Sequence, residues 1–120
     1  MLDKKEAREV AERYATAVTE VLSPDAIIFY GSYLNGTPHE GSCVDIGVFY
    51  NNFCPSVNWG EIMAQLGALV RRTWDEPDLY VMPCILDIFN DPSGFAADVL
   101  EKGEILYATE GFKDDVLATA

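Results

Sequence analysis

The sequence predicts a single domain of mixed helices and strands. We place it in the α+β class, although the same alternation also fits an α/β fold. Three observations lead to this prediction. The chain has 120 residues, the usual size of one domain, so we expect residues 1–120 to form a single unit. Its composition is globular, with 49% hydrophobic and 23% charged residues. Segments with helical spacing of apolar residues also alternate with short apolar runs rich in strand formers.

The first segment is predicted to be a helix that begins near Asp3. Asp3 and Glu6 have the spacing of a capping box, with Asp at the cap position. The apolar residues that follow form one helical stripe: Ala7, Val10, Ala11, Tyr14, Ala15, Val18, Val21 and Leu22. Ser23-Pro24 ends the helix, because the residue before a proline is kept out of the helical region.

Two short strands are predicted next, with a loop and a short helix between them. Ala26–Tyr30 is an apolar run rich in strand formers, and residues 31–42 are interrupted by glycine and proline. The second strand is predicted over Val44–Tyr50, where successive side chains point to opposite faces. One face carries Val44, Ile46, Val48 and Tyr50, and the other carries Asp45, Gly47 and Phe49.

A second amphipathic helix and a third strand are predicted in the middle of the chain. Asn58 and Glu61 begin the helix, which ends near Trp74. Its apolar stripe is expected to pack in the core: Trp59, Ile62, Met63, Leu66, Leu69 and Val70. The strand runs from about Leu79 to Phe89, and Pro83 within it indicates an edge strand or a bulge.

The C-terminal part is predicted to hold one more helix and a short strand. Asp91-Pro92 begins the helix and Gly103 ends it. Its inward-facing residues are Phe95, Val99 and Leu100. Ile105–Tyr107 is expected to add a short strand, and residues 110–120 are expected to form a loose tail.

The charge of the chain argues against nucleic-acid binding. The formal net charge is −12, with twenty acidic residues against eight basic ones. A protein that grips a phosphate backbone needs Lys and Arg for that purpose, and the adjacent basic pairs here are Lys4-Lys5 and Arg71-Arg72. The acidic excess either keeps the chain soluble or faces a basic partner.

The cysteines and the N-terminus predict a cytoplasmic protein. Cys43, Cys54 and Cys84 are odd in number and irregular in spacing, so they do not indicate a disulfide framework. The N-terminal residues are charged and lack the apolar core of a signal peptide. No apolar run approaches the roughly 20 residues that span a bilayer.

Three polar features lie near the ends of predicted strands. Gly31-Ser32 follows the first strand, Asp45 lies at the start of the second, and Asp87 lies late in the third. If these strands are neighbours, the two carboxylates and the Gly-Ser turn share one cleft. Carboxylates together with substrate phosphates hold Mg²⁺, and a glycine at a helix start lets backbone N–H groups approach a phosphate. The group is therefore suited to binding a metal-nucleotide complex.

These residues resemble the nucleotidyltransferases of the DNA polymerase β type. The signature of that family is Gly-Ser, ten residues and Asp-x-Asp. This chain has Gly31-Ser32, the ten residues Tyr33–Ser42, and then Cys43-x-Asp45. Leu86-Asp87-Ile88 matches the third carboxylate of the family, which lies on a later strand, and residues 101–107 are similar to the close of its minimal domains. The resemblance extends over most of the chain, from Ala7 to about Tyr107.

The resemblance implies a fold, an activity and a set of site residues. The fold is a mixed sheet of three to four strands with flanking helices. The activity is transfer of a nucleoside monophosphate from a triphosphate such as ATP to a hydroxyl acceptor, with Mg²⁺ or Mn²⁺. Gly31 and Ser32 would hold the triphosphate, while Asp45 and Asp87 would be catalytic and hold the metal. Stand-alone minimal domains of this family commonly work as antitoxins with a helical protein partner of the HEPN type.

Two positions depart from the family pattern. Cys43 occupies the place of the first metal-binding Asp, and Tyr33 stands where relatives often carry Arg. A thiol is a soft ligand, whereas Mg²⁺ prefers hard oxygen. We therefore expect weakened metal binding and impaired catalysis.

Several alternatives remain open at this stage. Cys43 also fits a small buried apolar residue, and a soft-metal cluster with His39 and Asp45 lacks an evident fourth ligand. Instead of an enzyme, the chain fits a degenerate nucleotide-binding or antitoxin-like module that binds a partner. A structural domain that forms homo-oligomers is the third reading, and it would show no nucleotide affinity.

Overall fold

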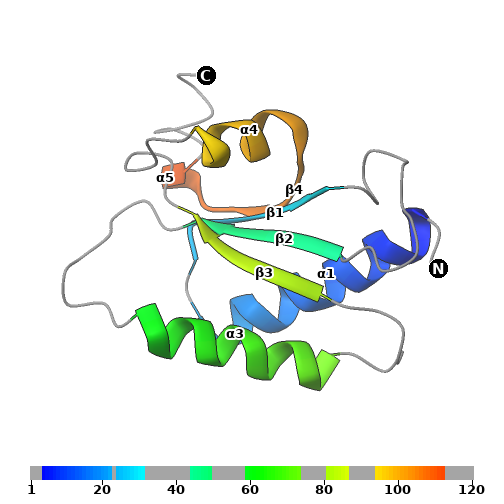
Figure 1. Ribbon diagram of the computed structural model, residues 1–120, viewed down its shortest axis with the longest axis vertical. Helices are drawn as coiled ribbons and strands as arrows, with labels where there is room; N and C mark the ends of the chain where they lie inside the picture. Colours follow the sequence, from blue (N-terminus) through cyan, green and yellow to red (C-terminus); the bar gives the residue numbers. More distant parts are fainter. Residues whose placement is uncertain are drawn as a thin grey trace.

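A four-stranded mixed sheet with helices on both faces forms the domain (Figure 1). The computed structural model describes residues 4–22, 24–31, 44–49, 59–73, 81–86 and 94–112. Its elements are α1 (Lys4–Val21), β1 (Ala26–Tyr30), β2 (Val44–Phe49), α3 (Trp59–Thr73), β3 (Val81–Leu86), α4 (Phe95–Lys102), β4 (Glu104–Ala108) and α5 (Glu110–Phe112). This architecture confirms the predicted α+β class and the mixed sheet of up to four strands.

The strand order in the sheet is β3-β2-β1-β4. β1 pairs antiparallel with both β2 and β4, whereas β2 and β3 run parallel. A parallel pair needs a crossover connection, and α3 lies in the segment between these two strands. β3 lies at an edge of the described sheet, which confirms the position that Pro83 predicted.

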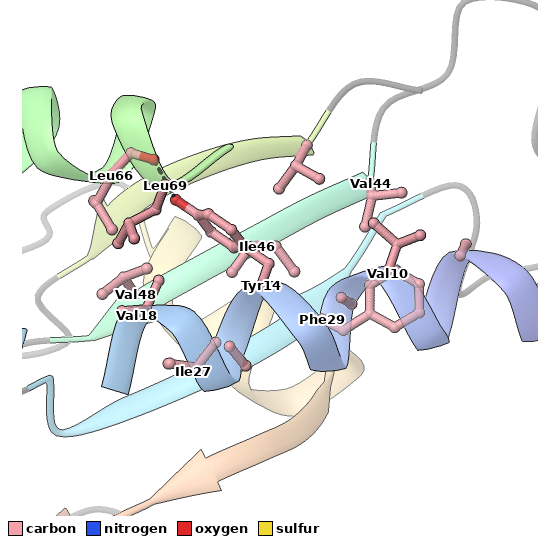
Figure 2. Packing of buried hydrophobic residues seen from close by; sticks show 14 residues of the cluster. Val10, Tyr14, Val18, Ile27, Phe29, Val44, Ile46, Val48, Leu66 and Leu69 are labelled. Carbon is pink, nitrogen blue, oxygen red and sulfur yellow. Dashed lines mark hydrogen bonds between the residues drawn. The ribbon is translucent and has the colours of Figure 1, made fainter. Parts of the chain in front are cut away.

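The face of the sheet that carries α1 and α3 holds the larger core cluster (Figure 2). The stripe predicted on α1 is buried there as far as Val18, with Tyr14 and Val18 fully inaccessible, whereas Val21 is 50% exposed. The Tyr14 hydroxyl donates a hydrogen bond of 2.7 Å to the backbone carbonyl of Leu66, so a polar contact joins α1 to α3 inside the core. The cluster is completed by alternate residues of the two central strands: Ile27, Phe29, Val44, Ile46 and Val48.

The opposite face of the sheet carries α4 and a smaller apolar cluster (Figure 1). It comprises Ala26, Ile28, Phe49, Ala96, Val99 and Phe112. The rings of Phe49 and Phe112 meet edge to face with centroids 5.6 Å apart. The prediction of a loose tail from residue 110 is therefore wrong for Glu110–Phe112. That turn is helical because burial of Phe112 holds it against the sheet, and residues 113–120 lie outside the described part.

Other element boundaries follow the predictions with small differences. The short strand predicted at Ile105–Tyr107 is present as β4, and Gly103 is the C-cap of α4. The described helix α4 begins at Phe95 after Gly94, while the predicted start at Asp91-Pro92 lies outside the described residues. No helix in the described ranges is both long and apolar enough to cross a membrane.

Candidate functional site

The end of β1 and the start of β2 form a tight corner. Tyr30 is paired with Asp45 across the antiparallel ladder, so Gly31 comes directly against the Asp45 side chain. A Cβ on Gly31 would overlap the Asp45 carboxylate, and it would lie 3.0 Å from Cγ and 3.2 Å from Cβ of that residue. Gly31 also has a φ of +92°, which L side chains rarely adopt. Glycine is therefore required here both by backbone conformation and by space.

Asp45 is a half-buried carboxylate on the α4 face of β2. Gly47 and Phe49 share that face, whereas Val44, Ile46 and Val48 point into the core on the other side. Burial raises the pKa of Asp45 above its ordinary value, because a charged carboxylate loses solvation there. Within the described ranges, no Lys or Arg forms an ion pair with it. The position therefore favours a neutralising partner such as a proton or a cation.

Tyr30 and Phe95 form the wall of the corner on the side of α4. Their rings meet at 77° with centroids 5.9 Å apart, which holds the Tyr30 ring in place. The pKa of Tyr30 is raised to about 12, mainly by burial and further by the charges of Cys84 and Asp45. Tyr30 is therefore a neutral hydroxyl at physiological pH.

Two sulfur-containing residues of β3 lie on the other side of Asp45. In the parallel register Asp45 is opposite Met82, and Gly47 is opposite Cys84. The Cys84 thiol donates a weak hydrogen bond of 3.8 Å to the carbonyl of Ile85. Burial and the Asp45 charge raise the pKa of this thiol. Asp45 is thus flanked by Tyr30 in one neighbouring strand and by Met82 and Cys84 in the other.

Comparison with known proteins identifies the family. A family model described as "Polymerase beta, Nucleotidyltransferase" matches residues 15–111, which is most of the chain. The chain belongs to this nucleotidyltransferase family. No curated protein matches the sequence of this nucleotidyltransferase domain.

Two solved structures have the same fold as this nucleotidyltransferase domain. The first, described as a toxin-antitoxin with AMP-PNP, is 18% identical over 87% of this chain and 77% of the other, with a TM-score of 0.55. The second, a candidate nucleotidyltransferase from Sulfolobus solfataricus, is 15% identical over 89% of this chain and 85% of the other, with a TM-score of 0.56. Their likeness shows that the chain has the fold expected of the nucleotidyltransferase family to which it belongs.

The structure places some of the predicted site residues together and leaves others outside its described ranges. Gly31 and Asp45 lie side by side at the corner, as their positions near strand ends predicted. Ser32, Cys43 and Asp87 lie outside the described residues. Leu86, the residue before Asp87, is paired with Phe49, at the opposite end of β2 from Asp45. The ligand roles predicted for Asp45 and Asp87 therefore stay predictions.

Sequence reasoning did not select Tyr30, Met82 or Cys84 as neighbours of Asp45. Tyr30 precedes the Gly-Ser turn, so an antiparallel pairing of the first two strands would have predicted its place beside Asp45. Met82 and Cys84 are brought in by the parallel pairing of β2 and β3. No local pattern in the sequence specifies that register.

The donor atoms at the corner determine which metal ions this site can bind. Among the residues that the structure describes, no three His, Cys, Asp and Glu side chains come together. Asp45 is the carboxylate at the corner, and one carboxylate together with nucleotide phosphates is a common way to hold Mg²⁺. The residues therefore fit a cation that is shared with a nucleotide, and they do not form a Mg²⁺ site of protein oxygen atoms alone.

A separate pocket lies between α1 and β4, on the side of the sheet away from Asp45. Arg8, Thr16, Thr19 and Tyr107 contribute to its lining. Arg8 is paired there with Glu12 at 3.2 Å and with Glu104, so its charge is already neutralised. The pocket shares no lining residue with the corner of Gly31 and Asp45.

Proposed function

We propose that this domain binds a nucleoside triphosphate as a metal complex at the corner of Gly31 and Asp45. It then transfers the nucleoside monophosphate to a hydroxyl of an acceptor. The observation that carries this proposal is the direct packing of the Asp45 carboxylate against Gly31. The contact supports the proposal because Gly31 is the first residue of the Gly-Ser motif and Asp45 is at the second Asp position, in a chain that belongs to the family.

In the proposed reaction the acceptor oxygen forms a bond to the α-phosphorus of the nucleotide. The bond from that phosphorus to the pyrophosphate oxygen breaks, pyrophosphate leaves, and the hydroxyl proton passes to solvent. A bound divalent cation neutralises charge on the phosphates. Asp45 holds this cation, and its half-buried position strengthens their attraction because fewer water molecules screen it. Gly31-Ser32 is proposed to bind the phosphates through backbone N–H groups and the serine hydroxyl.

The acceptor proposed for the domain is a protein. The low content of Lys and Arg, eight residues in all, gives little support to an RNA acceptor. One structure with the same fold is described as a toxin-antitoxin with AMP-PNP. We extend that description to this chain as a proposal, with ATP as a nucleotide and a helical toxin of the HEPN type as the partner.

A specific observation also favours a second function, nucleotide or partner binding without transfer. Cys43 occupies the place of the first metal-binding carboxylate, and no three His, Cys, Asp and Glu side chains gather in the described ranges. Such a domain would keep the Gly-Ser turn and Asp45 for binding the nucleotide. It would lack the second oxygen ligand that fixes the geometry of the metal.

Calorimetry tests both functions without knowledge of the acceptor. ATP or GTP is titrated with Mg²⁺ or Mn²⁺ into the natural chain and into Asp45→Ala, Asp45→Asn and Cys43→Asp. We expect metal-dependent binding that falls at least about ten-fold in both Asp45 variants, since the loss of a charged ligand costs more than about 1.4 kcal/mol. Asp87→Ala tests the third carboxylate that the family resemblance predicts.

The outcomes separate the candidates. Binding by the natural chain, with pyrophosphate released when the partner protein is added, supports transfer. Binding by the natural chain without pyrophosphate release supports the binding module, and in that case only Cys43→Asp releases pyrophosphate. Absence of nucleotide binding in every variant would refute the assignment of this corner as a nucleotide site.

A further inference from the structure

Phe95, the first residue of α4, remains exposed although its neighbours in the helix are buried. The sequence predicted that Phe95 faces inward together with Val99, but 44% of Phe95 is exposed, whereas Ala96 and Val99 are buried. A single exposed apolar side chain is ordinary on a protein surface. The significance of this ring therefore depends on what lies beside it.

Phe95 lies next to the corner that holds the candidate site. Its ring meets the ring of Tyr30 edge to face, with centroids 5.9 Å apart. Tyr30 is directly opposite Asp45 in the antiparallel ladder of β1 and β2, and such partners project from the same face with Cβ atoms about 4.5–5.5 Å apart. Gly31, which follows Tyr30, packs against the Asp45 carboxylate. Tyr30 therefore connects the exposed ring to the corner, on the face of the sheet that carries α4 (Figure 1).

This surface offers a different chemistry to each end of a nucleotide. The Asp45 carboxylate is suited to the metal-phosphate end, whereas an aromatic ring is suited to the flat face of a base. In an edge-to-face pair at an interplanar angle of 77°, at least one face of the Phe95 ring is not covered by Tyr30. The Phe95 side chain has no hydrogen-bonding group, so it does not distinguish adenine from guanine. A purine, with two fused rings, covers more of it than a pyrimidine does.

Met82 is the alternative support for a base, on the other side of Asp45. It is directly opposite Asp45 in the parallel ladder and is 51% exposed. Its thioether chain has three rotatable bonds, so ordering it against a base costs more side-chain entropy than using a ring that is already held. Contact with Tyr30 holds the ring of Phe95. The observations therefore favour the side of Phe95.

We propose that Phe95, held by Tyr30, stacks on the base of the nucleotide whose phosphates bind at the corner of Gly31 and Asp45. This inference rests on the proposed function and adds the class of nucleotide. Purine nucleoside triphosphates bind more tightly than CTP or UTP, and ATP and GTP bind with similar affinity. Base stacking contributes to the affinity for the nucleotide, whereas the corner holds the metal and the phosphates.

The test compares a ligand that has a base with one that has none. ATP, GTP, CTP and inorganic tripolyphosphate are titrated with Mg²⁺ into the natural chain by calorimetry. Phe95→Ala is expected to weaken ATP and GTP binding about five-fold or more, to weaken CTP binding by a smaller factor, and to leave tripolyphosphate binding unchanged. Phe95→Trp keeps an aromatic face and keeps ATP binding. Tyr107→Ala, which removes another exposed ring at the pocket between α1 and β4, is the matched control and leaves all four affinities unchanged.

Thermal melting checks that each variant folds, and the outcomes separate this inference from the proposed function. The base site is overturned if folded Phe95→Ala binds ATP like the natural chain, or weakens ATP and tripolyphosphate equally. Loss of ATP affinity in Met82→Ala but not in Phe95→Ala also overturns it. If ATP binding depends on Phe95 but Asp45→Ala changes neither ligand, the corner is refuted as the phosphate site and the base site stands. A natural chain that binds neither ATP nor tripolyphosphate refutes both.

Discussion

Replacement of Gly31 by alanine tests the corner of the candidate site most directly. Two costs follow from the structure. The φ of +92° places an alanine in a region that costs L residues roughly 1–2 kcal/mol. The added methyl group also overlaps the Asp45 carboxylate, which must leave its rotamer at a cost of about 0.5–1.5 kcal/mol. The two costs together are about 1.5–3.5 kcal/mol, and we expect Gly31→Ala to lower the free energy of unfolding by this amount less the gain from a more restricted unfolded chain.

Gly94→Ala is a matched control for this substitution. Gly94 also has a positive φ, +76°, but nothing lies within 4 Å of a Cβ built there. Gly94→Ala therefore loses stability only through its backbone conformation, by roughly 1–2 kcal/mol. The gain from restricting the unfolded chain, about 0.4–1 kcal/mol for Gly to Ala, applies equally to both variants. The difference between the two variants isolates the overlap with Asp45.

Urea denaturation at neutral pH measures both variants, first in the natural background and then with Asp45→Ala. Removing the carboxylate relieves the overlap, so the excess cost of Gly31→Ala should fall by about 0.5–1.5 kcal/mol. Nucleotide titration of Gly31→Ala should show weakened binding, because the carboxylate is displaced. The reasoning is refuted if Gly31→Ala destabilises the chain no more than Gly94→Ala, or if its excess cost is the same without the carboxylate.

Three further predictions concern the core and the pH dependence of stability. Tyr14→Phe removes the buried hydrogen bond to the Leu66 carbonyl and should cost about 1 kcal/mol in urea denaturation, whereas Tyr107→Phe at a partly exposed position should cost nearly nothing. Phe112→Ala should cost about 3–5 kcal/mol, and a value near zero would mean that α5 does not hold against the sheet. Burial raises the pKa of Asp45 above its ordinary 3.8, so its contribution to stability is present below that pH and is lost as the pH rises through the raised pKa. Asp45→Asn should therefore be more stable than the natural chain at pH 7 and lose this advantage near about pH 3, and equal urea midpoints across this range would contradict the raised pKa.

Much of the fold follows from patterns that are local in the sequence. The stripe on α1 faces the core because its apolar residues recur at the helical period, and Pro24 limits its length through backbone sterics. Alternation in β2 assigned Asp45 to the face opposite Val44 and Ile46, where the structure has it. Gly31 was selected by its spacing to Asp45, and the structure packs the two together.

The sequence could not predict the burial of single residues that belong to no repeating pattern. Phe112 stands in a short segment with no periodicity, so nothing local marked it as a core residue. It is buried because the ring of Phe49, on a strand far away in the sequence, lies beside it. Composition and period describe only neighbours along the chain, and this contact joins residues that are not neighbours.

The surroundings of Asp45 also combine features that the sequence determined with features that only the tertiary structure decided. The sequence by itself determined that a carboxylate follows a Gly-Ser turn at a family-specific spacing, and that Cys43 replaces its usual companion. Only the tertiary structure decided that Met82 lies opposite Asp45 and Cys84 opposite Gly47, while Leu86 lies opposite Phe49 at the far end of β2. A parallel pair is joined through a long crossover, so its register is set by packing of the helix and both strands together. That register is a property of the assembled core, and it determines which side chains of β3 lie beside Asp45.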